Sequence, residues 1–349
     1  MDTAVVTGIT GQTGSYMAEL LLEKGVKVIG LVRRVSKINS ENIKHILDKI
    51  TLEEGELTDY ISTTEIIKKY KPKYLFNFAA QSHVHVSWKQ PVSTFVTNTN
   101  SVLNLLEGIR LYSPETIFYQ ASTSEMFGDV LTVPQDESHP LRPRSIYGAA
   151  KVAAHSLVKV YRESYNLEAY CGILFNHESP RRHESFVTRK ITKAVAKISK
   201  ELKRGLTPTP LILGNLDSKR DWSHAFDMCQ GIWLMVNSGR NKDYVLASGE
   251  TKTIREFLEL AFNFSGVSYI DVNPEKVEPA TGKNSLQINY IHPKGNRPLV
   301  LSSREFYRPA EVDILLGDPS LAIKELGWYR TYNFPDLVSE MIMYDTRNG

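Results

Sequence analysis

The sequence predicts an α/β fold, in which a doubly wound parallel sheet is joined to a smaller C-terminal α/β lobe. In the first half of the chain, short β-branched runs alternate with amphipathic helical runs, which is typical of βαβ units. After residue 176 this alternation gives way to an irregular pattern rich in basic and small residues. A chain of 349 residues is long enough for two such lobes.

The individual elements follow from apolar periodicity. Strands are expected at Ala4–Thr7, Lys27–Val32, Tyr74–Phe78, Thr116–Gln120 and Ala169–Phe175. Helices are expected at Ser15–Lys24, Thr63–Lys69, Val92–Leu111 and Ser145–Tyr165. The first helix is followed by Gly25, a residue suited to the position after a helix C-terminus. The stretch Val272–Asn296 is rich in Pro, Gly, Asn and Lys and is expected to be loop or short strands.

Composition narrows the class of protein. The formal net charge is only +3, from 42 Lys and Arg against 39 Asp and Glu, so we expect no nucleic-acid partner. Because no run of 18 apolar residues and no signal-like N-terminal segment occurs, we expect a cytoplasmic protein with no membrane contact. Cys171 and Cys229 are expected to be buried thiols of a reducing compartment. His83 and His85 are expected on a strand or loop edge, and no third ligand has suitable spacing, so we expect no metal site.

A glycine-rich turn, Gly8-x-x-Gly11-x-x-Gly14, follows the first strand and opens the first helix. Glycines allow a tight turn and let the backbone approach a pyrophosphate, which a helix N-terminus stabilises through its free N–H groups. A glycine-rich turn can also be purely structural, but its position between strand and helix favours a dinucleotide site. The sequence therefore predicts a Rossmann-type domain.

The end of the second strand indicates which dinucleotide binds. An NAD enzyme usually has an acidic residue there to hold the ribose 2′-hydroxyl, whereas this chain has Arg33 and Arg34. Guanidinium groups pair with phosphate oxygens through forked, charge-assisted hydrogen bonds. The pair could also be two ordinary surface charges, but its position favours the 2′-phosphate of NADP.

A second group of polar residues has the composition of a catalytic site. Ser122, Thr123 and Glu125 lie just after an expected strand, at the carboxyl edge where α/β sheets bind ligands. Tyr147 and Lys151 are four residues apart on an expected helix and therefore share one face. An ammonium beside a phenol favours the phenolate, which would make the tyrosine a base near neutral pH.

The glycine turn, the Ser/Thr segment and the Tyr-x-x-x-Lys pair together resemble the extended short-chain dehydrogenase/reductase superfamily. Three longer stretches, at 175–190, 213–222 and 307–319, closely resemble the GDP-mannose 4,6-dehydratase family. The most specific of them is the string Asn-His-Glu-Ser-Pro-Arg-Arg at 176–182. The match spans nearly the whole chain.

This resemblance implies that the substrate is a GDP-sugar, oxidised at C4, dehydrated across C5–C6 and reduced at C6, with the NADP regenerated. Tyr147 would take the C4 hydroxyl proton while Lys151 holds the ribose, and Thr123 would bind the C4 oxygen. Glu125 would remove the C5 proton and help the C6 hydroxyl to leave. A simple epimerase or reductase needs no such carboxylate.

The family pattern also implies the binding residues. The cofactor would contact Gly8, Thr10, Gly11, Gln12, Thr13, Gly14, Arg33, Arg34, Glu56, Leu57, Ala79, Ala80, Gln81, Ser82, Lys151, His177 and Arg182. The sugar nucleotide would contact Ser87, Asn176, Lys190, Arg220, Arg308 and Glu311. The chain departs from the pattern at Glu56, Ser93 and His183, which bears on the adenine site and on subunit contacts.

The expected organisation follows from both arguments. We expect residues 1–176 to form an NADP-binding domain, with segments around 213–250 returning to it, and residues 177–349 to form mainly a sugar-nucleotide lobe. The family commonly forms dimers or tetramers, so a homo-oligomer is expected. The alternatives are a dehydratase of another GDP-sugar such as a heptose, a 4-epimerase or 4-ketoreductase of the same superfamily, and an inactive NADP-binding scaffold.

Overall fold

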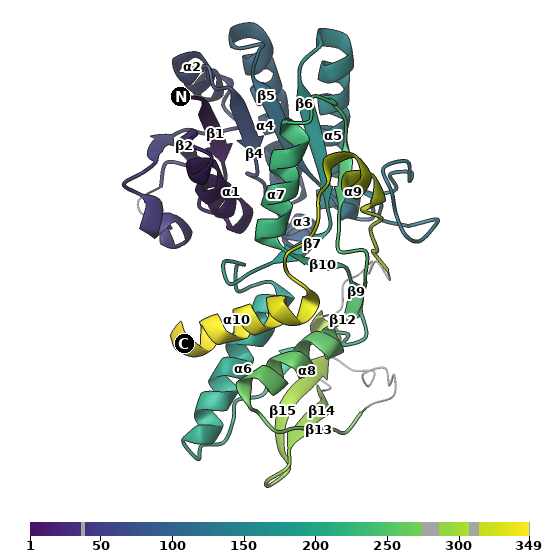
Figure 1. Cartoon of the computed structure of the whole chain (residues 1–349). Helices are drawn as coiled ribbons and strands as arrows, with labels where there is room; N and C mark the ends of the chain where they lie inside the picture. The colour runs from purple at the N-terminus through teal and green to yellow at the C-terminus, as the bar shows by residue number, and fades with distance from the viewer. Residues whose placement is uncertain (36–38, 274–285, 307–313, 349) are drawn as a thin grey trace. The chain divides into compact units, whose positions relative to one another are not determined.

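The protein was analysed as a computed structural model that describes residues 1–35, 39–273, 286–306 and 314–348 (Figure 1). Contacts divide the chain into two compact units, each built from three segments. The first unit contains residues 1–177, 224–249 and 315–331. The second contains residues 178–223, 250–314 and 332–349.

The first unit is built on a seven-stranded sheet with the order β11-β6-β5-β4-β1-β2-β3, and every neighbouring pair is parallel. Its strands are β1 (Thr3–Thr7), β2 (Lys27–Val32), β3 (Thr51–Glu54), β4 (Tyr74–Asn77), β5 (Ile117–Thr123), β6 (Ala169–Leu174) and β11 (Tyr244–Leu246). The direction of strand succession reverses between β1 and β4. In open α/β sheets, such a reversal opens a ligand crevice at the carboxyl ends of the strands.

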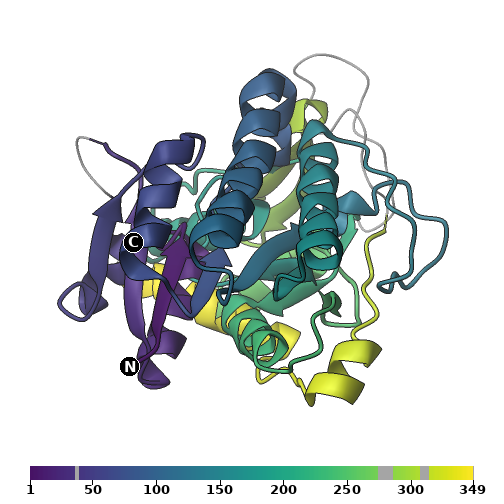
Figure 2. The same ribbon diagram turned by 90° about the horizontal axis from the view of Figure 1, so that it is seen from above.

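Two helical layers cover this sheet. One layer contains α1 (Gln12–Glu23) and α7 (Ala225–Val236), whose apolar residues share a core with one face of the sheet. The other contains α2 (Tyr60–Tyr70), α4 (Pro91–Tyr112) and α5 (Ile146–Tyr165), which pack on the opposite face. Figure 2 shows α4 and α5 running side by side. The shorter helices of the unit are η1 (Glu41–Ile46), α3 (Val84–Lys89), η2 (Ser124–Met126) and α9 (Ser320–Leu326).

Local chemistry fixes where several helices begin and end. Asp59 caps α2 by accepting hydrogen bonds from the backbone N–H groups of Ile61 and Ser62. Ser145 caps α5 in the same way, with its hydroxyl oxygen 3.0 Å from the Gly148 nitrogen. Helix α1 ends before Gly25, which adopts a φ of 71°, as the sequence predicts.

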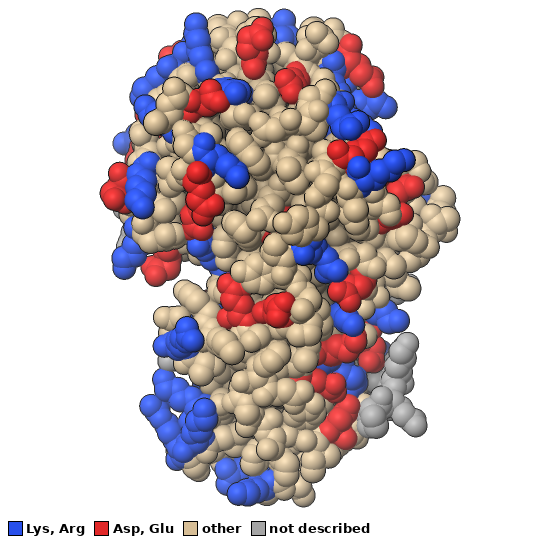
Figure 3. All heavy atoms as spheres, viewed as in Figure 1, with Lys and Arg blue, Asp and Glu red and all other residues tan. Residues whose placement is uncertain are grey.

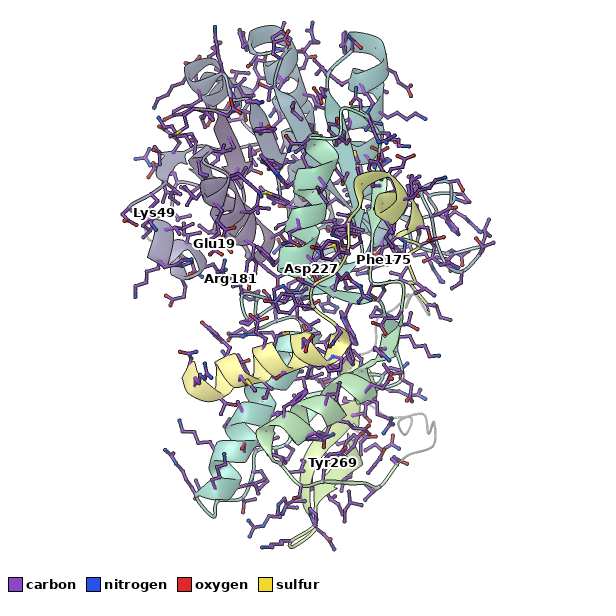
Figure 4. The ribbon with its side chains drawn as sticks, in the orientation of Figure 1. Glu19, Lys49, Phe175, Arg181, Asp227 and Tyr269 are labelled. Atoms are coloured by element: carbon purple, nitrogen blue, oxygen red, sulfur yellow. The ribbon has the colours of Figure 1, made fainter. Side chains whose placement is uncertain are left out.

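Two later segments, 224–249 and 315–331, return to the first unit and are joined to each other by polar contacts. Asp227, on the first turn of α7, is fully buried and accepts from the Thr331 backbone nitrogen at 3.0 Å (Figure 4). The Trp328 indole nitrogen donates to the Asp227 carbonyl at 2.9 Å. On the visible face of this unit, Lys and Arg are interspersed with Asp and Glu (Figure 3), in keeping with the small net charge.

The second unit has its own apolar core, to which the three helices α6 (Val187–Lys203), α8 (Ile254–Ser265) and α10 (Phe334–Asn348) contribute. Its four-stranded sheet has the order β13-β14-β15-β8, with β13 (Ile270–Asp271), β14 (Leu286–His292), β15 (Arg297–Ser303) and β8 (Leu211–Leu213). Tyr269 (Figure 4) packs between Phe262 and Tyr290 in this core. The remaining short elements are β7 (Asn176–Glu178), β9 (Lys219–Arg220), β10 (Trp222–His224), β12 (Lys252–Thr253) and η3 (Arg304–Phe306).

The predicted fold class is confirmed, because the first unit contains the expected parallel sheet with helices on both faces. One local prediction is wrong. His85 does not lie on a strand or loop edge but within α3, whose N-cap residue is His83. The roles assigned to the two domains stay predictions.

Candidate active site

The glycine-rich turn has the close packing that a dinucleotide-binding turn requires. Gly8 adopts a φ of 66°, and a Cβ there would lie 2.9 Å from the backbone nitrogen of Ala79 at the end of β4. A Cβ on Gly14 would lie 2.3 Å from the Gly8 carbonyl oxygen. Gly11 is the N-cap residue of α1, and the first turn of this helix contains no acidic residue. The turn therefore presents helix N–H groups without a competing negative charge.

His177 lies directly against this turn. Its Nδ1 is 2.9 Å from the Phe175 carbonyl and its Nε2 is 2.9 Å from the Thr13 hydroxyl. Since a carbonyl only accepts, Nδ1 carries the proton and Nε2 accepts from Thr13. Gln12 donates to the His177 carbonyl at 2.9 Å. The start of β7, which follows β6, is thereby joined to the start of α1.

The other predicted cofactor residues of this unit follow the carboxyl ends of β2, β3 and β4. Arg33 and Arg34 follow β2 and are exposed, and the Arg34 Nε lies 4.0 Å from Glu54. Glu56 is turned into its own loop, where its carboxylate accepts from the Thr58 backbone nitrogen and hydroxyl. Leu57 is nearly buried. Because all the strands are parallel, these residues share one edge of the sheet with the glycine turn.

The segment after β4 is fixed by side-chain hydrogen bonds. The backbone nitrogen of Ala79 donates to the Thr7 hydroxyl at 3.1 Å. Gln81 exchanges two backbone–side-chain hydrogen bonds with Asn98, at 2.8 and 3.0 Å. Ala80 and Ser82 lie between these anchored positions and α3, whereas Ser87 is fully buried on α3 and donates to the Val84 carbonyl. Thr10, in the glycine turn, accepts at its carbonyl from Asn42 at 3.0 Å.

The four predicted catalytic residues are carried by two neighbouring elements. Thr123 is the last residue of β5, and Glu125 lies in the 3₁₀ turn η2, which Thr123 caps. Tyr147 and Lys151 lie on α5, which packs against η2. A Cβ on Gly148 would lie 2.7 Å from the Glu125 carbonyl oxygen, so the glycine beside Tyr147 permits this close approach.

Lys151 is almost completely buried, with 4% of its surface exposed. Its ammonium donates to the Ala121 carbonyl at 3.0 Å and lies 5.8 Å from the centre of the Tyr147 ring. Burial lowers the pKa of Lys151 from 10.5 to about 8. A cation at this position is therefore held beside the phenol ring with little solvent screening.

The sequence analysis missed a buried polar chain beneath these residues. Ser122 and the Nδ1 of His155 are 3.0 Å apart, and the Nε2 of His155 lies 3.5 Å from Asp243. His155 lies four residues after Lys151 on α5, so helical spacing was the available signal. Asp243 just precedes β11, a three-residue strand that the sequence analysis did not predict.

The predicted substrate residues are only partly described. Asn176 begins β7 in the first unit, whereas Lys190 and Arg220 belong to the second, as does Arg182, which was predicted to bind the cofactor. Arg182 pairs with buried Glu178 at 3.1 Å, and Lys190 donates to the Ile212 carbonyl at 2.7 Å. Arg220 is also buried. Arg308 and Glu311 lie outside the described residues.

Two broader features concern the residues that the structure describes. Within these residues, no group of three or more His, Cys, Asp or Glu side chains could hold a metal ion. In the same part of the chain, no helix is both long enough and apolar enough to cross a membrane. Cys171 and Cys229 are buried thiols that form no disulfide, and their burial is as predicted.

Comparison with known proteins places this site in a family. The family described as GDP-mannose 4,6 dehydratase matches residues 5–341. A GDP-mannose 4,6-dehydratase of Vibrio cholerae serotype O1 is 42% identical over 98% of this chain and 93% of its own length. One from Drosophila melanogaster is 43% identical over 98% of this chain and 85% of its own.

The fold is shared more widely than the sequence. The UDP-glucose 4-epimerase of Thermotoga maritima, crystallised with UDP-glucose, superposes with a TM-score of 0.80 at 22% identity, covering 100% of this chain and 99% of its own. The family match and the identity to whole dehydratase chains are far more specific than this likeness. By sequence over nearly its entire length, the chain belongs to the GDP-mannose 4,6-dehydratase family.

Proposed function

We propose that this protein is an NADP-dependent GDP-mannose 4,6-dehydratase, which converts GDP-mannose to GDP-4-keto-6-deoxy-mannose with loss of water. The observation that carries the proposal is the packing of η2, with Glu125, against the start of α5, with Tyr147 and Lys151. This arrangement joins a proton-accepting phenol and a carboxylate at one edge of the sheet. The family membership and the identity to named dehydratases support the same reaction.

The residues of the first unit fit a nicotinamide dinucleotide. The tight cradle formed by Gly8 and Gly14 at the start of α1 suits a pyrophosphate. Arg33 and Arg34, exposed at the end of β2, suit a 2′-phosphate, which favours NADP over NAD. The remaining cofactor contacts in the proposal are Thr10, Gly11, Gln12, Thr13, Glu56, Leu57, Ala79, Ala80, Gln81, Ser82, Lys151, His177 and Arg182.

The first chemical step needs a base at the C4 hydroxyl. Tyr147 takes that proton, and the Lys151 ammonium favours the phenolate form of the tyrosine. Thr123, at the end of β5, holds the C4 oxygen in place by a hydrogen bond. When bound, the nicotinamide supplies an acceptor for the hydride from C4 and later returns it to C6.

The second step depends on Glu125. A ketone at C4 makes the C5 proton acidic, and the Glu125 carboxylate removes it. The same carboxyl group then gives its proton to the C6 hydroxyl, which leaves as water while the C5–C6 double bond forms. Reduction at C6, protonation at C5 by a solvent proton relayed through Glu125, and release of the Tyr147 proton to solvent complete the product, with no net change in oxidation state.

The substrate, location and assembly complete the proposal. The GDP-sugar would be held by Ser87, Asn176, Lys190, Arg220, Arg308 and Glu311. The cationic side chains of this set suit a pyrophosphate. Ser87 is the weakest member of this set, because its hydroxyl is buried and already donates within α3.

Two buried thiols that form no disulfide suit a reducing compartment, which supports a cytoplasmic location. We also propose a homodimer or homotetramer, because α4 exposes Val92, Phe95, Val96 and Leu103.

The decisive experiment is incubation of the protein with GDP-mannose and NADP in deuterated water, followed by mass spectrometry. The expected product has lost water and carries deuterium at C5, because the original C5 proton leaves with the water and the proton that replaces it comes from solvent through the exchangeable Glu125 carboxyl group. A product of unchanged mass formula would instead indicate the runner-up, a 4-epimerase of the same superfamily. Turnover of a GDP-heptose in preference to GDP-mannose would keep the reaction and change the substrate.

A further inference from the structure

The polar chain beneath the catalytic helix connects that helix to the strand that carries Thr123. Lys151, His155 and Arg162 lie at intervals of four and seven residues and so share one face of α5. Lys151 donates to the carbonyl of Ala121 at 3.0 Å, and His155 meets the hydroxyl of Ser122 at 3.0 Å. Successive residues of β5 are thus tied to successive turns of α5, immediately before Thr123.

The hydrogen-bond directions in this chain can be assigned. Asp243 accepts from the Arg162 guanidinium and from the Cys171 backbone nitrogen, which is 3.0 Å away. The His155 Nε2 lies 3.5 Å from the same carboxylate, and this negative charge favours the tautomer with the ring proton on Nε2. The unprotonated Nδ1 then accepts from the Ser122 hydroxyl. Burial lowers the pKa of His155 and keeps this neutral form, although Asp243 acts in the opposite direction.

We propose that His155 is a positioning residue for the dehydratase reaction: by holding Ser122, it keeps Thr123 in register with Tyr147 and Lys151. In the proposed function, the Lys151 ammonium also binds the cofactor ribose. Its hydrogen bond to the Ala121 carbonyl must then compete with that contact. The link between His155 and Ser122 involves no group that the reaction uses. It therefore persists through the cycle and fixes the spacing of β5 and α5.

A positioning role and a purely stabilising role for His155 predict different effects on kcat. A displacement of about 1 Å between reacting groups can cost on the order of a hundredfold in rate. Loss of register would therefore lower kcat, while the binding of GDP-mannose, which depends on other residues, would change little. A merely structural histidine would instead lower stability and leave the kcat of the folded protein unchanged.

The test is a double-mutant cycle on His155→Leu and Ser122→Ala, with GDP-mannose as substrate and NADP as cofactor. Each single variant should lower kcat about tenfold with KM within about twofold of native, and the double variant should lose no more than either single one. His155→Asn, whose side-chain oxygen can still accept from Ser122, should recover most of the loss. The control is Tyr161→Phe, which removes a hydrogen bond from α5 to Glu107 of α4 and should lower stability without changing kcat.

A second readout does not need turnover. Hydrogen–deuterium exchange in residues 121–126 should become faster in His155→Leu and in Ser122→Ala but not in Tyr161→Phe. The proposal is overturned if kcat stays within twofold of native in folded His155→Leu, if the two losses add fully, or if exchange in 121–126 is unchanged. Only the kinetic test of this proposal rests on the proposed function. A native protein that does not dehydrate GDP-mannose would contradict that function. The exchange comparison would then decide by itself whether His155 anchors residues 121–126.

Discussion

Glu125 separates two reactions that one fold can support. The fold is also that of a UDP-glucose 4-epimerase, so it does not by itself decide the reaction. Only the dehydratase then needs a group that removes the C5 proton and helps the C6 hydroxyl to leave. The position of Glu125 in η2 places a carboxylate two residues after Thr123, which would bind the C4 oxygen.

The variant Glu125→Gln should keep the fold and cofactor binding, because the amide is nearly isosteric with the carboxylate. It should lose elimination, because an amide cannot accept the C5 proton. Proton transfer by a placed side chain is typically worth about a hundred- to ten-thousand-fold, so kcat should fall by at least that lower bound. Mass spectrometry of a single turnover should detect 4-keto sugar that has not lost water.

The matched control for this variant is Tyr147→Phe, which removes the base for the first step. It should give neither the 4-keto sugar nor the nicotinamide absorbance change that accompanies oxidation. Turnover by Glu125→Gln within a few-fold of native would show that another group removes the C5 proton.

Arg33 and Arg34 lead to a prediction about cofactor choice. Replacing them with Asp and Ser should weaken NADP binding much more than NAD binding, because only NADP carries the 2′-phosphate that the guanidinium groups would pair with. Titration of both cofactors against native and variant protein measures this difference. Equal losses for the two cofactors would show that the pair does not contact the 2′-phosphate.

Lys151 leads to a prediction about stability and pH. Its pKa is about 8 in the folded protein, below its usual value of 10.5, so burial of the charge costs stability in full below pH 8. The cost falls as pH rises from about 8 to about 10.5, because the folded protein has already lost the proton that the unfolded chain still binds. Lys151→Met should therefore be more stable than native at pH 7 by about 1 to 3 kcal/mol.

Urea unfolding of native protein and Lys151→Met at pH 7 and pH 10 measures this cost. The difference between the two midpoints should narrow at the higher pH, and activity should be lost in the variant at both. A constant difference across this range, or a less stable variant at pH 7, would contradict the burial cost assigned to the ammonium.

At the scale of elements, the contact of α5 with η2 determines whether Tyr147 can reach the substrate beside Glu125. The first turn of α5 approaches closely because Gly148 has no side chain. Gly148→Ala should push this turn away from the Glu125 carbonyl, since the added Cβ would lie 2.7 Å from that oxygen.

We expect Gly148→Ala to lower kcat about tenfold or more, because a small displacement of a base strongly reduces proton transfer. The comparison is Gly205→Ala, at a glycine with open space around its Cβ, which lies in the loop after α6. That variant should lose some stability from its positive φ, at 71°, and keep kcat. Equal kcat values in the two variants would show that the close packing at Gly148 is not needed for activity.

At the scale of the whole molecule, the exposed apolar residues of α4 bear on assembly. Val92, Val96 and Leu103 recur at intervals of four and seven residues, so they form one stripe, and Phe95 lies beside it. Exposed apolar stripes of this kind are common where copies of a chain associate. The native protein should therefore be at least dimeric in light scattering at micromolar concentration.

The variant Val92→Asp/Val96→Asp should shift this assembly towards the monomer, because two buried carboxylates would face the partner. Leu131→Asp, at an exposed apolar residue of a loop, is the control and should leave the assembly unchanged. A native protein that is already monomeric would refute the assembly proposal.

The sequence alone determined the parallel sheet and much of the candidate site. Five of the seven strands of the first unit were predicted, since buried β-branched runs such as Lys27–Val32 have a strong local pattern. The glycine turn and the Tyr147–Lys151 pair were found for the same reason, because each motif is contained within a few residues. Strands β3 and β11 were missed, as one is polar and the other is only three residues long.

Tertiary structure decided what depends on pairs that are distant in sequence. His177 meets Thr13, and His155 links Ser122 to Asp243, through contacts between residues 33 to 164 positions apart. The wrong prediction at His85 has a related cause, because two alternating histidines look alike on a strand and at a helix start until the neighbours are known. Local patterns therefore specified the elements and the chemical groups, whereas the burial and polar partners of those groups arose only from packing.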